Sequence, residues 1–280
     1  LVDGCTPVSP ACGNCWAAAQ TAMRANHPND IVRSRAEGLT ADGHFNGRVR
    51  LNHEFLDKPL RTKKPTAWAV WNDLFHKDVP FDFITRAFDV MCSWRWPNKA
   101  AQREGDESKL EDPGHIFIVL TKRPERIQPW LAWVGEHWPG DSPLNVNLEV
   151  SGHFGENVWL GVTAENQQTA DERIPILLQT PAAVRFVSVE PMLGPVDLTK
   201  IPHPLRHPKA TFPVYLNAPA ALHWVICGGE SGRHARPMHP DWVRSLRDQC
   251  QAAGVPFFFK QWGEWGRRKE ADLSLNGRQY

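Results

Sequence analysis

Continuous apolar runs alternate with helix-patterned segments over most of the chain. The runs are rich in Val, Ile, Phe and Trp, which is typical of strands that helices cover on both faces. They occupy Thr66–Trp71, His115–Leu120, Val158–Thr163, Val184–Val189, His223–Cys227 and Val255–Phe259. Helices are predicted between them at Phe81–Trp94, Pro124–His137, Gln168–Gln179 and Pro240–Gly254. The alternation predicts an α/β fold with a mostly parallel sheet.

The first quarter of the chain is patterned less regularly. A helix is predicted over Trp16–Asn26, where Ala is frequent, Met23 is a further good helix former and Pro28 follows closely. The polar segment Asp30–Gly47 is expected to be an exposed excursion. Arg48–Asn52 alternates charged and apolar residues and is counted as a seventh strand. Phe55–Lys64 is expected to form a basic helix or turn, with a solvated charged face favoured over a phosphate contact.

Polar residues follow most of these strands directly. In parallel α/β folds and barrels the functional site forms at the carboxyl ends of the strands, so these residues would converge on one mouth. A single polar residue after a strand is more often a turn or a helix cap. The repetition across the strands favours a site. The clusters are Asn52-His53, Asn72-Asp73, Thr121-Lys122-Arg123, Glu165-Asn166, Glu190, Gly228-Gly229-Glu230-Ser231 and Lys260-Gln261.

Near the start of the chain, Cys5, Cys12 and Cys15 form a C-x6-C-x2-C loop rich in Pro and Gly. Thiolates at this spacing can bind one metal centre and leave one coordination position open. Such a position is used by the [4Fe-4S] clusters that reduce S-adenosylmethionine (SAM). Two alternatives stay open. One is a zinc site with a fourth ligand from the residues His27, His44 or His53, and the other is unrelated core or loop cysteines.

Length and composition narrow the class of protein. A chain of 280 residues can form a single barrel or doubly wound domain, here 1–266, with insertions near 99–114 and 201–221 and a polar tail over 267–280. The net charge of +1 provides no global field for nucleic acid. No membrane span or leader is recognised, so a cytoplasmic location is expected. In that compartment the six cysteines favour metal or thiol chemistry over disulfides.

Several of these motifs together resemble the uncharacterised phage and bacterial three-Cys-motif family, whose members are similar to radical SAM proteins. The resemblance spans nearly the whole chain. The matching pieces are Gly4–Trp16, Asn72–His76, Leu120–Pro124, Trp159–Thr163, Arg185–Pro191, Gly228–Gly232 and Phe258–Gly263.

The resemblance implies a radical-SAM-like, TIM-type (β/α) barrel, full or partial, whose first strand would fall before Leu1. It implies that the three cysteines hold the cluster. Gly228, Gly229 and Glu230 resemble the Gly-Gly-Glu element that meets the SAM amino group in radical SAM enzymes. That element follows the second strand in those enzymes and the penultimate strand here, so a substrate-binding role is equally open.

The leading hypothesis is therefore a radical SAM enzyme with a [4Fe-4S] cluster and SAM as cofactors. The family's link to phage genomes favours a nucleic acid or nucleotide as the unknown substrate. Two alternatives are a zinc-binding nucleic-acid-interaction module without activity and a degenerate SAM-binding barrel that serves as a scaffold for a protein partner. The candidate cofactor-binding residues are Lys122 or Arg123 for the SAM carboxylate, Asp73, Glu165, Glu190 or Glu230 for its ammonium, and Asn72, Gly228 and Gly229 on the same rim.

Overall fold

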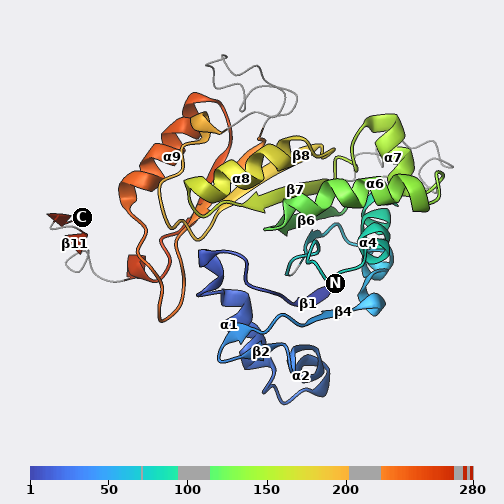
Figure 1. Cartoon of the computed structure of the whole chain (residues 1–280), viewed down its shortest axis with the longest axis horizontal. Helices are drawn as coiled ribbons and strands as arrows, with labels where there is room; N and C mark the ends of the chain where they lie inside the picture. The colour runs from blue at the N-terminus through green and yellow to red at the C-terminus, as the bar shows by residue number, and fades with distance from the viewer. Residues whose placement is uncertain (71, 94–113, 202–221, 268–273, 276–277, 280) are drawn as a thin grey trace. The chain divides into compact units, whose positions relative to one another are not determined.

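A computed structural model describes residues 1–70, 72–93, 114–201, 222–267, 274–275 and 278–279 (Figure 1). The chain divides into two compact units. Unit 1 comprises Leu1–Asp3, Val49–Leu160 and Thr180–Val184. Unit 2 comprises Gly4–Arg48, Gly161–Gln179 and Arg185–Tyr280. The prediction of a single domain stays a prediction.

The predicted α/β alternation is confirmed. A six-stranded sheet has the order β10-β9-β8-β7-β6-β5, and the pairs β5–β6, β8–β9 and β9–β10 are parallel. Neighbouring strands therefore follow one another in the chain, as in a singly wound barrel and unlike a doubly wound sheet. The strands are β5 Ala67–Ala69, β6 Ile116–Thr121, β7 Val158–Thr163, β8 Val184–Val189, β9 Trp224–Gly228 and β10 Phe257–Gln261.

In unit 1, three helices lie close to one another (Figure 1). Their shared core is rich in buried aromatic side chains. Helices α4 (Phe81–Ser93), α6 (Ile127–His137) and α7 (Pro143–Ser151) pack through fully buried Trp130, Phe88 and their neighbours. The Trp130 indole donates to Thr85 Oγ1 at 2.9 Å, so its one polar atom is satisfied inside the core. The short helix η4 (Pro124–Arg126) precedes α6.

In unit 2, side-chain caps define where the two longer helices begin. The helix α8 (Gln167–Leu178) starts with a capping box between Asn166 and Thr169. The helix α9 (Pro240–Ala252) starts with the His239 ring accepting the N–H of Asp241. The turn η5 (Leu198–Lys200) packs near α9. These boundaries lie within two residues of the predicted ones.

The assignment of Arg48–Asn52 to the main sheet is wrong. The strand β4 (Val49–Leu51) pairs instead with β1 (Val2–Gly4) in a separate two-stranded sheet. The expectation that the strand before the cysteine loop lies before Leu1 is also wrong, because β1 ends immediately before Cys5. A strand of three residues is too short to show a period in the sequence, so its pairing partner could not be found from pattern.

The segment predicted as an exposed excursion is structured. It contains α2 (Asp30–Ala36) and the hairpin strands β2 (Thr40–Ala41) and β3 (His44–Phe45). Asn29 caps α2 by accepting the N–H groups of residues 31 and 32 at 3.0 and 3.2 Å. The segment lies beside α1 (Trp16–Arg24), and buried Leu39 and Phe45 explain why it folds.

The remaining elements are short. They are η1 (Pro10–Cys12), η2 (His53–Phe55), α3 (Lys58–Arg61), η7 (Trp265–Arg267) and the antiparallel pair β11 (Ser274–Leu275) and β12 (Arg278–Gln279). The predicted insertions near 99–114 and 201–221, and most of the predicted tail, lie outside the described residues. Among the described residues, each helix is too short or too polar to cross a bilayer.

Candidate functional site

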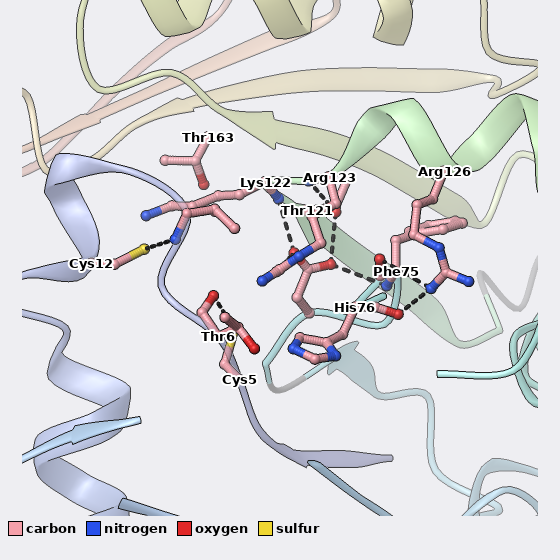
Figure 2. Close-up of polar contacts among 12 residues, drawn as sticks. Cys5, Thr6, Cys12, Phe75, His76, Thr121, Lys122, Arg123, Arg126 and Thr163 are labelled. Carbon is pink, nitrogen blue, oxygen red and sulfur yellow. Dashed lines mark hydrogen bonds and ion pairs between the residues drawn. The ribbon is translucent and has the colours of Figure 1, made fainter. Parts of the chain in front are cut away.

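Three thiols lie in one loop of unit 2. Cys5 directly follows β1, Cys12 ends η1, and Cys15 is the N-cap of α1. All three are partly exposed. The Val8 N–H donates to Cys12 Sγ at 3.5 Å (Figure 2). The Ser9 hydroxyl lies 3.8 Å from the same sulfur. Contacts of this kind stabilise negative charge on sulfur, which is the form that binds metals.

A bracket of hydrogen bonds ties this loop to the end of β9. Asn14 Nδ2 donates to Glu230 Oε2 at 3.0 Å and to the His234 carbonyl at 2.8 Å. The Arg236 guanidinium pairs with both Glu230 oxygens and also donates to the Pro10 carbonyl at 3.0 Å. Residues more than 200 positions apart in sequence therefore form one network. Hereafter Asn14, Glu230 and Arg236 are called the bracket.

The charges in the bracket reinforce each other. Burial raises the pKa of the Glu230 carboxyl, but hydrogen bonds from Arg236 and Asn14 outweigh this and lower it below its usual value. The hydrogen bond with Glu230 in turn raises the pKa of Arg236. Glu230 is thus an ionised, almost fully buried acceptor at the end of a strand. Its predicted contact with the SAM ammonium stays a prediction.

The glycine after β9 is required by a close approach of two loops. A Cβ on Gly229 would lie 2.0 Å from the Trp262 carbonyl oxygen, and one on Gly263 would lie 2.2 Å from the Glu230 carbonyl oxygen. Backbone hydrogen bonds join the same loops, from Gly229 N–H to the Gln261 carbonyl and from residue 264 to the Glu230 carbonyl, both at 2.9 Å. The ends of β9 and β10 are therefore interlocked.

A second charged cluster lies at the ends of β8, β9 and β10. Lys260 Nζ contacts both oxygens of Glu190, at 3.0 and 3.1 Å, and Gln261 Nε2 donates to Glu190 Oε1 at 3.3 Å. Gln261 also donates to the Ser231 hydroxyl at 3.1 Å. A Cβ on Gly228 would lie 2.9 Å from the Glu190 carboxylate, so glycine leaves room for this charge beside the strand.

Glu165, which follows β7, lies in the interior. Its side chain is 0% exposed, and Arg173 Nη1 contacts Glu165 Oε2 at 2.9 Å. The same nitrogen donates to the Thr163 carbonyl at 2.8 Å. The pair therefore joins the end of β7 to α8 within unit 2.

In unit 1, Asp73 collects four donors at the end of β6. Thr121 Oγ1 and Arg123 Nη1 donate at 2.7 Å each, the Phe75 N–H at 3.0 Å and the Lys122 N–H at 3.2 Å (Figure 2). The Asp73 and Arg123 side chains are only 8% and 5% exposed. The arrangement fixes the loop after β5 against β6, and it uses the carboxylate for internal contacts.

Two residues that were not predicted belong to the same region, namely His76 in the loop after β5 and Arg126 at the end of η4. Arg126 donates to the carbonyls of His76 and Val79, so it holds the turn before α4 (Figure 2). His76 is fully buried, and burial together with the charge of Arg123 lowers its pKa to about 4. Asn72, which has a positive φ of 59°, donates to the Val2 carbonyl at 3.1 Å.

The other cysteines are core residues. Cys92, Cys227 and Cys250 are buried, and burial raises the pKa of Cys227 and of Cys250 to about 12. Burial also raises the pKa of Cys92 well above its usual value. These thiols are therefore protonated at neutral pH and differ from the partly exposed thiols of the loop.

The loop cysteines are not gathered as metal ligands in the structure. Within the described ranges, no group of three or more His, Cys, Asp and Glu side chains is arranged to hold a metal ion. The donor set still fits a metal cluster chemically, because three partly exposed thiols on one loop are soft ligands.

One known family matches almost the whole chain. The family described as "Protein of unknown function (DUF5131)" matches residues 1–100 and 107–280. The chain belongs to this family. A comparison with curated proteins finds no match. Membership in DUF5131 covers every candidate residue in both units, but the family's description assigns no activity.

In this DUF5131 chain the predicted residues fall in two sets. Their convergence on one mouth stays a prediction. Unit 2 contains Cys5, Cys12, Cys15, Glu165, Glu190, Gly228, Gly229 and Glu230. Unit 1 contains Asn72, Asp73, Lys122 and Arg123. Asn14, Arg173, His76 and Arg236 complete these clusters and were not predicted, because only tertiary contacts show their partners.

Proposed function

We propose that this DUF5131 chain is a radical SAM-type enzyme whose three-cysteine loop binds a [4Fe-4S] cluster. One observation supports this most directly. Asn14, which stands between Cys12 and Cys15, hydrogen-bonds Glu230 at the carboxyl end of β9. The thiols therefore lie on the strand-end side of unit 2, where parallel α/β proteins bind their ligands. The sequential strand order supports a full or partial barrel of the radical SAM kind.

When bound, such a cluster would deliver an electron that cleaves SAM into methionine and a 5′-deoxyadenosyl radical. The protein's part is to bind three irons through Cys5, Cys12 and Cys15 and to orient SAM on the open iron. It also has to keep water away from the radical. A cytoplasmic location, in which thiols stay reduced, suits this chemistry.

Of the acidic candidates, Glu190 is the best placed to accept the SAM ammonium. Its side chain is 18% exposed. The side chains of Asp73, Glu165 and Glu230 are 8%, 0% and 2% exposed, and each forms an ion pair with an arginine. The partner of Glu190, Lys260, is 51% exposed and supplies a cation for the SAM carboxylate. Lys260 is therefore proposed beside Lys122 for this role, whereas Arg123 is engaged by Asp73.

The substrate proposed for this enzyme is a nucleic acid or nucleotide. Exposed basic side chains such as Lys58 and Arg61 on α3, which can contact phosphate, support this proposal. The net charge of +1 argues for a local contact over a long-range field.

Anaerobic purification and reconstitution test the proposed function. The expected result is a brown protein with about four irons that forms 5′-deoxyadenosine from SAM only when a reductant is added. Cys12→Ala should lose iron and SAM cleavage, whereas the matched control Cys250→Ala, at a buried thiol on α9, should retain both. A colourless wild-type protein with stoichiometric zinc would contradict the proposal, as would full iron and activity in Cys12→Ala.

One observation favours a second candidate, a degenerate barrel that binds SAM as a scaffold for a partner protein. Within the described part of the chain the loop cysteines do not form a metal-binding group. Calorimetry with SAM, on protein before and after reconstitution, separates the two. Equal binding in both preparations without SAM cleavage supports the scaffold, and binding that requires iron supports the enzyme.

A further inference from the structure

The three-cysteine loop has little structure of its own to hold its sulfurs in place. Between Cys5 and Cys15 the described regular structure is the single turn η1 (Pro10–Cys12). Its internal backbone hydrogen bonds are Cys12 N–H to the Ser9 carbonyl at 2.9 Å and Gly13 N–H to the Pro10 carbonyl at 3.2 Å. A loop rich in Pro and Gly with so few local bonds takes its shape from contacts with other segments.

Cys5 and Thr6 bond to Gly47, whereas the contacts that flank Cys12 come from the segment after β9. Pro10 and Asn14 flank Cys12, and both bond to that segment: Pro10 accepts from Arg236, and Asn14 donates to Glu230 and to the His234 carbonyl. The two contacts lie on either side of the Cys12 sulfur along the chain. Fixing both flanks restricts the backbone that carries Cys12 and, one residue after Asn14, Cys15.

The far side of the bracket is rigid. Glu230 belongs to the interlocked loops after β9 and β10, where backbone atoms approach so closely that Gly229 and Gly263 cannot carry a side chain without displacement. Trp265, after β10, donates to the Ala235 carbonyl at 2.7 Å and so also fixes the segment that carries Arg236. These contacts therefore fix the cysteine loop relative to the ends of β9 and β10.

From this geometry we infer that Asn14 and Arg236 are positioning residues, held by Glu230, that set the conformation and reactivity of Cys12 and Cys15. This gives Glu230 a bracing role and assigns roles to two residues that the Cys motif alone does not indicate. The inference concerns the thiols themselves. It rests on the proposed function only for its consequence, the uptake of iron.

Thiol labelling of the metal-free full chain tests the bracket. The variant Arg236→Gln removes the ion pair with Glu230, so the alkylation rates of Cys12 and Cys15 by iodoacetamide, followed for each cysteine by mass spectrometry, should rise about tenfold. Arg236→Lys, which keeps the charge, should recover part of the protection. The control Arg244→Gln removes an arginine from an exposed i,i+3 pair with Asp241 and should label as the wild type does.

A second variant covers the case in which Arg236→Gln does not fold. Asn14→Asp is nearly isosteric and places a carboxylate against Glu230, so it should expose Cys12 and Cys15 while the thermal midpoint changes little. Hydrogen exchange of peptides covering residues 5–15 should accelerate in the same variant. Wild-type labelling and exchange in every folded bracket variant would overturn the inference.

The labelling assay also separates this inference from the proposed function. If the wild type takes up no iron but the bracket variants still expose Cys12 and Cys15, the proposed function fails and the positioning role stands. If the wild type binds iron and the variants change neither labelling nor iron content, the positioning role fails alone.

Discussion

The stability of unit 1 should depend on pH through His76. This side chain is fully buried before α4, and its Nδ1 accepts the Asp78 N–H at 3.2 Å. Burial and then the positive charge of Arg123 lower the pKa from 6.5 to about 4, while the charges of Asp78 and Asp73 oppose this less strongly. Lys77 adds slightly to the lowering. His76 is therefore neutral in the folded protein at neutral pH.

The sign of the effect follows from where the proton binds. Because the folded pKa lies below the unfolded one, the unfolded chain binds more protons between pH 6.5 and about 4. The contribution of His76 to the free energy of unfolding is therefore complete above pH 6.5 and is lost as the pH falls from 6.5 to about 4. The difference of about 2.5 pKa units corresponds to about 3 kcal/mol in full, and to about 2 kcal/mol on going from pH 7 to pH 5.

The assay compares the wild type with His76→Asn. Asparagine keeps an acceptor near the position of Nδ1 but does not titrate, so this variant is less stable at pH 7 and loses about 2 kcal/mol less than the wild type on going to pH 5. The free energy of opening is measured from hydrogen exchange of α4 peptides as a function of urea. The control His137→Asn, at an exposed position on α6, should keep the wild-type pH dependence. Parallel pH profiles for wild type and His76→Asn would refute the reasoning.

Two further predictions concern stability. Gly229→Ala places a Cβ 2.0 Å from the Trp262 carbonyl oxygen. It should therefore destabilise the protein by about 2 kcal/mol in chemical denaturation, whereas Gly140→Ala, where no atom lies within 4 Å, should change little. Equal stability of the two variants would contradict the interlocked loops. Asp73→Asn leaves Arg123 buried without its charge partner and should cost about 3 kcal/mol, and Asp73→Asn combined with Arg123→Met should lose less than the sum of the single variants. Strict additivity would count against the pair.

Local pattern was sufficient for the long elements. The predicted strands Val158–Thr163 and Val184–Val189 have the same bounds in the structure, because apolar runs of this length bounded by polar residues leave one choice of strand. The helix α9 was found from Pro240 at its start, because a helix tolerates Pro only in its first turn. The short elements β1 and α2 were not predicted. The strand β1 depends on its partner β4, and the segment that contains α2 depends on buried Leu39 and Phe45.

The amino-acid sequence alone was enough to establish the α/β alternation, the three-cysteine motif and the polar residues after each strand, because all of these are local. Tertiary structure was needed to show which of those residues are already engaged. Asp73, Glu165 and Glu230 look alike in sequence, yet each binds an arginine that lies 6 to 50 residues away. A carboxylate in the interior is stable only with such a partner, and the folded chain alone determines which partner comes within reach.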